Sequence, residues 1–195
     1  MTHPLFFGYG SLVNRATHDY LDPRPATLNG WRRVWRRTTL REVAFLSVDP
    51  APGVSILGLT ARVPNGDWAA LDARERAYAR IDVAHAIEHD HEPGPTAVYR
   101  VSDGLIEGPS EAAPILLSYI DTVAAGFLDL YGADGVAHFF ATTTGWGPIR
   151  NDRAAPLYSR AQSPTPALRA MVDAHLAGFA GGGGSRPASP GATDR

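Results

Sequence analysis

The spacing of apolar residues changes once along this 195-residue chain, and that change limits the fold more than any other feature. In the first half, apolar residues recur mainly at every second position, as in "GWRRVWRRT" and "VSILGLTARVP", which is typical of strands. Over residues 115–130 and 165–179 they recur at every third or fourth position, which is typical of helices. We therefore predict an α+β fold: a small, mostly antiparallel β-barrel, closed or nearly closed, with flanking helices.

Local signals predict where several of these elements begin and end. The turn-rich "DPAPG", residues 49–53, is predicted to join the two strands of a hairpin. Asp67 is predicted to cap a helix that ends near Glu75. The apolar residues at 81–87 are spaced by two and predict one strand, followed by a returning strand after a Pro-Gly-Pro turn. Gly132 is predicted to end the long helix.

The composition argues against several classes of protein. The formal net charge is −2, which gives no electrostatic reason to expect a nucleic-acid or anionic-membrane partner. No segment approaches the ~20 unbroken apolar residues of a membrane span, and the N-terminal residues lack a signal-peptide pattern. The absence of cysteine excludes disulfides, thiolate nucleophiles and cysteine-ligated metals. We expect a cytoplasmic protein.

The chain is long enough to bury one sizeable core, and its composition marks no internal boundary. We predict a single domain over residues 1–180. The last fifteen residues, "GGGGSRPASPGATDR", are rich in glycine, proline and serine and have almost nothing to bury. We predict that residues 181–195 form a disordered tail, either native or added.

A glycine-rich turn follows the first apolar run, in "FFGYGSL". Residues 5–7 are typical of a short buried strand, and the glycines at 8 and 10 permit backbone conformations that a Cβ would forbid. Such a turn can direct several backbone N–H groups toward one point, which makes an anion or oxyanion site. A tight turn without a ligand is the simpler interpretation. From these residues alone, both interpretations stay open.

The segment "HAIEH", residues 85–89, matches the H-x-x-E-H pattern of inverted zinc peptidases. That pattern needs a helix to bring both histidines onto one face. Here the flanking apolar residues alternate, and in a strand His85 and His89 would lie about 13 Å apart, too far for one zinc ion. We predict no metal site, and a metal-dependent hydrolase using His85, Glu88 and His89 is kept as a less favoured alternative.

Other charged residues have simpler structural interpretations. "WRRVWRR" has the basic and aromatic composition of a nucleic-acid-binding segment, but its alternation predicts a strand whose arginines lie along the surface or pair with carboxylates. Asp152 and Arg153 are expected to hold a long loop in place. Glu75 lies where a helix ends before a strand, a common place for a cleft, with Tyr78 three positions on. A solvated surface carboxylate is the simpler interpretation of Glu75.

Six segments, taken together, resemble the γ-glutamylcyclotransferase-like superfamily. They are "FFGYGSL", "GWRRVW", "ILGLTARV", "LDARERAYARIDV", "YIDTVAAGF" and "IRNDRAAPLYSRA", which occur in the family's order between residue 5 and about residue 161. The resemblance implies a small β-barrel with flanking helices. It also implies an enzyme that cyclises a γ-glutamyl peptide or amine to 5-oxoproline and releases the amine, without a metal or cofactor.

The same resemblance implies roles for particular residues. In similar enzymes the backbone N–H groups of the Y-G-S-x loop contact the substrate, and a glutamate at the position of Glu75 is the general acid/base. Carried over, the substrate cradle is Tyr9, Gly10, Ser11 and Leu12, and the pocket tyrosines are Tyr78, Tyr119 and Tyr158. Family members often have a glycine directly after the catalytic glutamate, where this chain has Arg76. This departure leaves the acceptor half of the substrate open.

The alternative on the same scaffold is a non-catalytic module that binds a small γ-glutamyl or amino-acid ligand. An intact turn and a glutamate at the position of the acid/base favour the enzyme, because a binding protein needs no proton carrier. In either case the expected partner is a small molecule, with no nucleic acid and no membrane. The expected assembly is a monomer or a homodimer.

Overall fold

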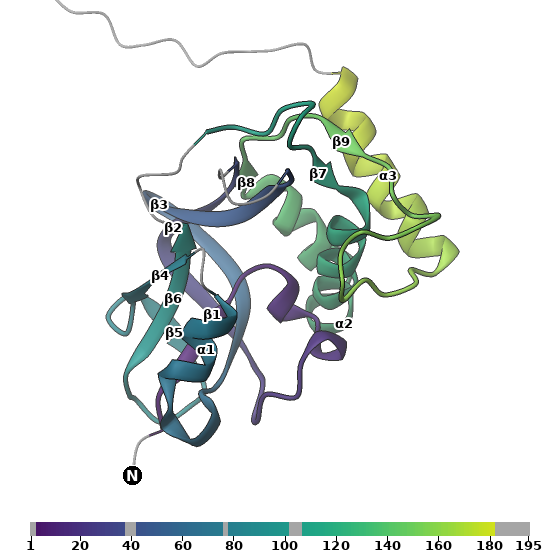
Figure 1. The fold of residues 1–195 in the computed structure, drawn as a ribbon. Helices are drawn as coiled ribbons and strands as arrows, with labels where there is room; N and C mark the ends of the chain where they lie inside the picture. Colours follow the sequence, from purple (N-terminus) through teal and green to yellow (C-terminus); the bar gives the residue numbers. More distant parts are fainter. Residues whose placement is uncertain (1–2, 38–41, 76–77, 102–106, 182–195) are drawn as a thin grey trace, which may run out of the picture.

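The computed structural model describes residues 3–37, 42–75, 78–101 and 107–181 (Figure 1). In chain order, its elements are β1 (Leu5–Gly8), η1 (Ser11–Val13), η2 (Arg15–Thr17), β2 (Arg24–Arg37), β3 (Ala44–Arg62), η3 (Pro64–Gly66), α1 (Trp68–Arg74), β4 (Tyr78–Asp82), β5 (Ile87–His89), β6 (Thr96–Val101), β7 (Ile115–Leu116), α2 (Leu117–Ala141), β8 (Thr143–Thr144), β9 (Ile149–Arg150) and α3 (Pro166–Gly181). The tail predicted for residues 181–195 lies outside the described residues, except for Gly181 at the end of α3.

Over the described ranges, seven strands form one sheet, in the order β4-β6-β1-β3-β2-β5, with β8 paired to β2. Most neighbours are antiparallel, whereas β1 pairs with β6 and β2 pairs with β8 in parallel. This sheet and the three α-helices confirm the predicted α+β class. Among the described residues, no ladder joins β4 to β5, so the barrel is not closed by strand pairing.

The hairpin predicted around residues 49–53 is wrong, because β3 is one long strand. Both halves of β3 pair with β2: Trp31 lies opposite Pro50, and Asn29 lies opposite Ser55. Residues 51–54 therefore face the single residue Gly30, where the register shifts. Gly30 has φ +78° and Gly53 has φ +80°, so both strands bend at this level and neither reverses its direction.

Two other boundaries differ from the prediction. Residues 81–87 are not one strand: β4 pairs with β6, a turn follows, and β5 pairs with β2. Gly132 interrupts α2 with φ 69° and ψ −164°, but the helix resumes and continues to Ala141. The Asp67 cap is as predicted, since its carboxylate accepts a hydrogen bond from Ala69 N at 2.8 Å.

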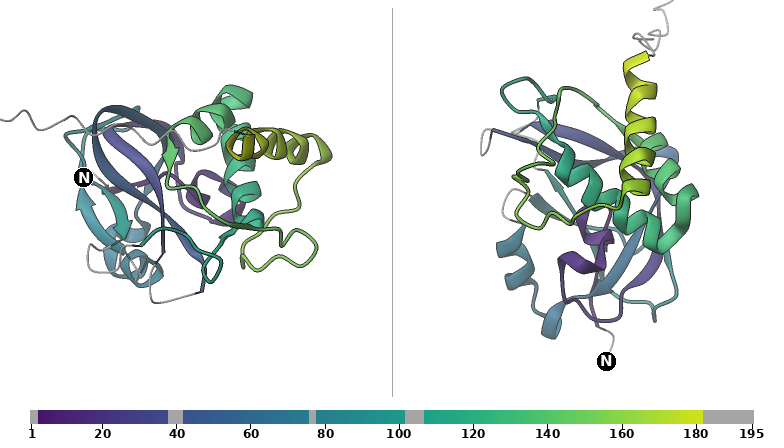
Figure 2. Two further views of the ribbon diagram at one scale, coloured as in Figure 1. Left: turned by 90° about the horizontal axis from the view of Figure 1, so that it is seen from above. Right: turned by 90° about the vertical axis from the view of Figure 1, so that its right-hand side faces the viewer.

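The helices α2 and α3 pack on one side of the sheet, and the segment of η1 and η2 lies between α2 and the sheet (Figure 2). Buried apolar side chains from these layers meet in one core, including Phe6, Phe7, Leu46, Ile56, Val13, Ile120, Val123, Phe127, Leu168 and Val172. The turn that follows β1 is therefore held from both sides. Within the described ranges, no helix combines the length and apolar character that a membrane span requires.

Candidate active site

The turn after β1 leaves backbone N–H groups available. The chain passes from Gly8 through Tyr9 and Gly10 into η1, where Val13 N donates to Gly10 O at 2.9 Å and Asn14 N donates to Ser11 O at 3.1 Å. Ser11 N donates to Tyr119 Oη over a long 3.4 Å. Within the described part of the chain, Gly10 N–H and Leu12 N–H form no hydrogen bond. Successive N–H groups of this kind make an anion-binding concavity.

These residues line a cavity of about 70 Å³. Its wall consists of Phe7, Gly8, Tyr9, Gly10, Ser11, Leu12, Leu46, Glu75, Tyr78, Tyr99 and Tyr119. Ligand pockets usually measure about 300–1,000 Å³, so this cavity has room for only part of a small-molecule ligand. The structure thus brings the turn and Glu75 into one pocket, although they lie more than 60 residues apart in the sequence.

Glu75 is positioned by the end of α1. Its backbone N donates to Leu71 O at 3.0 Å, and its backbone O accepts from Tyr78 N at 2.8 Å, so it caps the C-terminus of α1 and is bonded to the first residue of β4. Burial is the largest cause that raises the pKa of the Tyr9 and Tyr119 hydroxyls, and the negative charge of Glu75 raises both pKa values further. The carboxylate is therefore electrostatically coupled to two tyrosines of the same pocket. Arg76 lies outside the described residues.

The tyrosines around the pocket are fixed by the sheet and by one another. Tyr9 Oη donates to Tyr99 O at 2.7 Å, and Tyr78 Oη donates to Leu46 O at 3.1 Å. The Tyr158 ring meets Tyr119 edge-on, with 5.0 Å between the ring centroids. Tyr158 is thus one ring removed from the cavity wall, whereas the other predicted site residues line the wall directly.

The loop that carries Tyr158 is tied to the helices, as the Asp-Arg pair predicted. Arg153 Nε and Nη2 donate to Asp121 of α2 at 2.7 and 2.8 Å, and Nη1 donates to Asp173 of α3 at 2.8 Å. Asp152 accepts hydrogen bonds from Ser118 N at 2.8 Å and Ser118 Oγ at 2.6 Å. These residues position the loop and take no part in lining the cavity.

Asp152 is expected to make the protein sensitive to acid. Burial works to raise the pKa of this carboxyl, but hydrogen bonds from Ser118 and Leu157 outweigh burial and lower it. The unfolded chain then binds the proton more readily, so stability is present above pH ~4 and is lost as the pH falls below that value. Asp152→Asn, which turns an NH₂ toward donor groups, should cost about 2 kcal/mol at pH 7.

Urea unfolding at pH 7 and at pH 3 measures this effect. The unfolding midpoint of the Asp152→Asn variant should depend less on pH than that of the wild type. Equal pH dependence of the two proteins would show that the acid sensitivity arises from other carboxyl groups.

The H-x-x-E-H segment does not form the helix that a zinc peptidase needs. Residues 84–86 make a turn and 87–89 a strand, with Glu88 Oε1 accepting from Asn29 Nδ2 at 2.7 Å and His89 Nδ1 accepting from His91 N at 3.1 Å. Among the described residues, no three histidine, aspartate or glutamate side chains are grouped so that they could hold a metal ion. The geometry therefore does not support the metal-dependent hydrolase.

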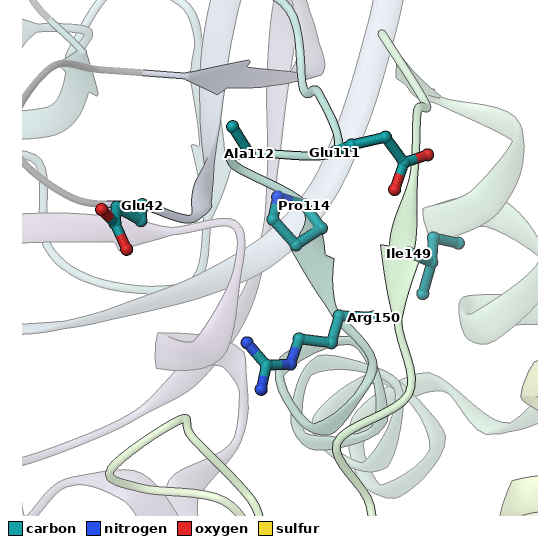
Figure 3. Close-up of a pocket in the computed structure, with 6 residues that line it drawn as sticks. All are labelled: Glu42, Glu111, Ala112, Pro114, Ile149 and Arg150. Atoms are coloured by element: carbon teal, nitrogen blue, oxygen red, sulfur yellow. The ribbon is translucent and has the colours of Figure 1, made fainter.

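A larger depression of about 430 Å³ lies elsewhere, beside β7 and β9 (Figure 3). It is lined by Glu42, Glu111, Ala112, Pro114, Ile149 and Arg150. The two carboxylates and the guanidinium lie on different sides of it and do not converge on one position (Figure 3). None of the predicted site residues belongs to its lining, so the smaller cavity is the stronger candidate for chemistry.

Four residues of the cavity wall were not predicted as site residues: Phe7 and Gly8, which directly precede the predicted cradle, and Leu46 and Tyr99, which lie far from it in the sequence. Leu46 belongs to β3 and Tyr99 to β6, and the order of strands in the sheet brings both beside the turn. Their own neighbours in the sequence carry no motif. A correct strand order would have been the signal needed to find them.

Known proteins share both the sequence pattern and the fold. The family profile described as "Gamma-glutamyl cyclotransferase, AIG2-like" matches residues 6–116, which include the turn and Glu75. A solved structure titled "Gamma-glutamyl cyclotransferase" is similar, with a TM-score of 0.56, 16% identity and coverage of 87% of this chain and 98% of that chain. An uncharacterized protein from Homo sapiens gives a TM-score of 0.55 and 16% identity, with coverage of 87% and 97%. At such identities these structures show the fold alone. No curated protein matches this chain.

Proposed function

This chain belongs to the γ-glutamyl cyclotransferase, AIG2-like family, and from that premise we propose that it cyclises a γ-glutamyl peptide or amine to 5-oxoproline. The α-amine of the γ-glutamyl group attacks its own γ-carbonyl carbon. A C–N bond forms in the new ring, the γ-amide C–N bond breaks, and the amine leaves with one added proton. The reaction consumes no other reactant.

The observation that supports this proposal is the shared pocket of Glu75 and the turn. Because the nucleophile is tethered to the carbonyl that it attacks, the enzyme mainly has to hold the folded conformer. One carboxylate next to both nitrogens can take the proton from the attacking amine and give it to the leaving amine. We assign this role to Glu75.

The turn is assigned to the oxygen of the γ-carbonyl, on which negative charge develops during attack. Donors that are already in place stabilise such charge better than donors that must reorient. Gly10 N–H and Leu12 N–H have no hydrogen-bond partner within the described part of the chain. The 3.4 Å contact of Ser11 N with Tyr119 Oη is weak enough to be replaced by a hydrogen bond to the substrate oxygen. The proposed ligands for the rest of the γ-glutamyl group are the hydroxyls of Tyr78 and Tyr119, with Tyr158 supporting Tyr119.

Release of 5-oxoproline from a panel of substrates tests the reaction. The panel contains glutathione, several γ-glutamyl dipeptides and γ-glutamyl-ε-lysine. We expect wild-type protein to release 5-oxoproline and amine in equal amounts from at least one of them, and the best substrate identifies the acceptor class. Folded protein that binds a panel member without turning it over would instead support the non-catalytic binding module.

Location and assembly stay predictions from the sequence. The cytoplasmic location rests on a cysteine-free composition, and either a monomer or a homodimer is compatible with the proposed reaction, because the pocket is formed by one chain.

A further inference from the structure

Arg33 of β2 is completely buried, with 0% of its surface exposed. Its guanidinium donates three hydrogen bonds: Nε to Tyr9 O at 2.8 Å, Nη1 to Thr142 Oγ1 at 2.7 Å, and Nη2 to Leu57 O. The side chain thus joins the turn after β1 to β3 and to the end of α2. The first of these bonds is made to the residue that begins the candidate oxyanion site.

The acceptors that the structure describes for the Arg33 guanidinium are all neutral: two backbone carbonyls and one hydroxyl. Within the described residues, no carboxylate forms an ion pair with it, and its guanidinium lies over the Phe127 and Phe139 rings at 4.8 and 5.5 Å. Burial lowers the pKa of Arg33 to about 9, so the guanidinium is still charged at neutral pH. A buried cation without a counterion is costly for the stability of a fold. We expect a fold to tolerate this loss of stability where the buried positive charge acts on a functional site.

The geometry of one peptide unit connects this charge to the pocket. In a planar trans peptide the C=O and the following N–H point in opposite directions. Arg33 holds the Tyr9 C=O, so the N–H of Gly10 is turned to the opposite side, and Gly10 lines the cavity. A carbonyl that accepts a bond from a cation also polarises its own peptide unit, which makes the N–H a stronger donor.

We propose that Arg33 is a positioning residue, which fixes the Tyr9–Gly10 peptide and strengthens Gly10 N–H as a donor to the developing oxyanion. The inference rests on the proposed cyclotransferase reaction. It adds a residue that touches no substrate atom and acts through the backbone of the turn. Arg33 itself is not among the residues that line the cavity.

Arg33 also links structural elements, so the test must separate charge from stability. The variants are Arg33→Met and Arg33→Gln, which are both neutral, and Arg33→Lys, which keeps the charge. Arg24→Met is the matched control, because Arg24 lies on the same strand in an ion pair with Asp22 at 2.9 Å and lines neither cavity. The melting temperature of each variant is measured alongside its kinetics.

The kinetic expectation follows from where the interaction acts. Loss of one oxyanion donor lowers kcat about 10²- to 10³-fold. The hydrogen bond to the oxyanion is stronger in the transition state than in the bound substrate, so KM should change less than about threefold. We expect about 100-fold lower kcat in the neutral variants and about tenfold lower kcat in the Lys variant, with wild-type kcat in the Arg24 control. If Arg33→Met fails to fold, Arg33→Gln provides the neutral comparison. Wild-type kcat in a folded neutral variant, or kcat that follows melting temperature regardless of charge, would overturn the proposal.

A second measurement needs no substrate. The amide resonance of Gly10 in a ¹H–¹⁵N spectrum reports the hydrogen bond accepted by the preceding carbonyl. It should move in all three Arg33 variants and stay in place in the Arg24 control; an unmoved Gly10 resonance contradicts the proposal. If the wild type releases no 5-oxoproline, the proposed function fails, while this spectrum still decides whether Arg33 controls the Tyr9–Gly10 peptide.

Discussion

Glutamine in place of Glu75 is expected to lower kcat for 5-oxoproline release by about 10²- to 10⁴-fold, the usual contribution of a general acid/base. The amide has the same size as the carboxylate, so the end of α1 and the shape of the cavity should be kept. It cannot take a proton from the attacking amine or return one to the leaving amine. KM should change much less than kcat, because the lost interaction belongs to the transition state.

The measurement is 5-oxoproline release at saturating concentrations of the best panel substrate, for wild type and for Glu75→Gln. Glu88→Gln is the matched control, since Glu88 bonds Asn29 on β2 and lies outside the cavity wall. We expect wild-type kcat in that control. Unchanged kcat in Glu75→Gln would remove Glu75 from the reaction. A loss confined to Glu88→Gln would place the carboxylate that the reaction needs outside the cavity.

Elements with local signals could be predicted from the sequence. The cap at Asp67 and the apolar face of α3 depend on side chains a few positions apart, and both agree with the structure. The bend in β3 depends on a distant partner. Proline and glycine at residues 49–53 fit a hairpin turn as well as they fit a bend within one strand. Pairing with β2 decides between the two, because β3 continues along β2 on both sides of the point where residues 51–54 face Gly30. No local pattern contains that information.

The arginines of β2 show that the prediction of site residues is limited in the same way, by partners that are distant in the sequence. Their alternation predicted surface or paired cations, and Arg36 does pair with Asp49. Arg33 has the same sequence surroundings but is buried against Phe127, because α2 covers its side of the strand. A helix about 90 residues further along the chain thus determines which arginine becomes part of the core. Motif similarity could predict the turn and Glu75, but it contained no signal for Arg33.

Gly126 of α2 should be intolerant of even a methyl group. An alanine Cβ at this position would lie 2.5 Å from Asn14 N, 2.6 Å from Asn14 Cα and 2.7 Å from Val13 C. All three are backbone atoms, so no side-chain rotation relieves the overlap. Alanine would otherwise be favoured by about 1 kcal/mol of helix propensity. We expect Gly126→Ala to destabilise the protein by a net ~2 kcal/mol or more, and to lower Tm by about 4–8 °C.

Gly178→Ala in α3 is the control, because a Cβ there meets no atom within 4 Å. Helix propensity acts alone at that position, so this variant should be stabilised by about 0.5–1 kcal/mol. Thermal unfolding of the two variants should therefore change in opposite directions. Stabilisation of both would show that α2 does not press on the segment after the turn.

The effect of Gly126→Ala should extend to catalysis. Asn14 is anchored to α2 by its own side chain, whose Nδ2 donates to Thr122 O at 2.9 Å. Asn14 N also closes η1 through its bond to Ser11 O, so a methyl group that displaces Asn14 must move the turn amides as well. Below its melting temperature, Gly126→Ala should have a lower kcat than wild type, whereas Gly178→Ala should keep the wild-type kcat. The same close approach of α2 would then account for both the stability of the fold and the alignment of the amide donors.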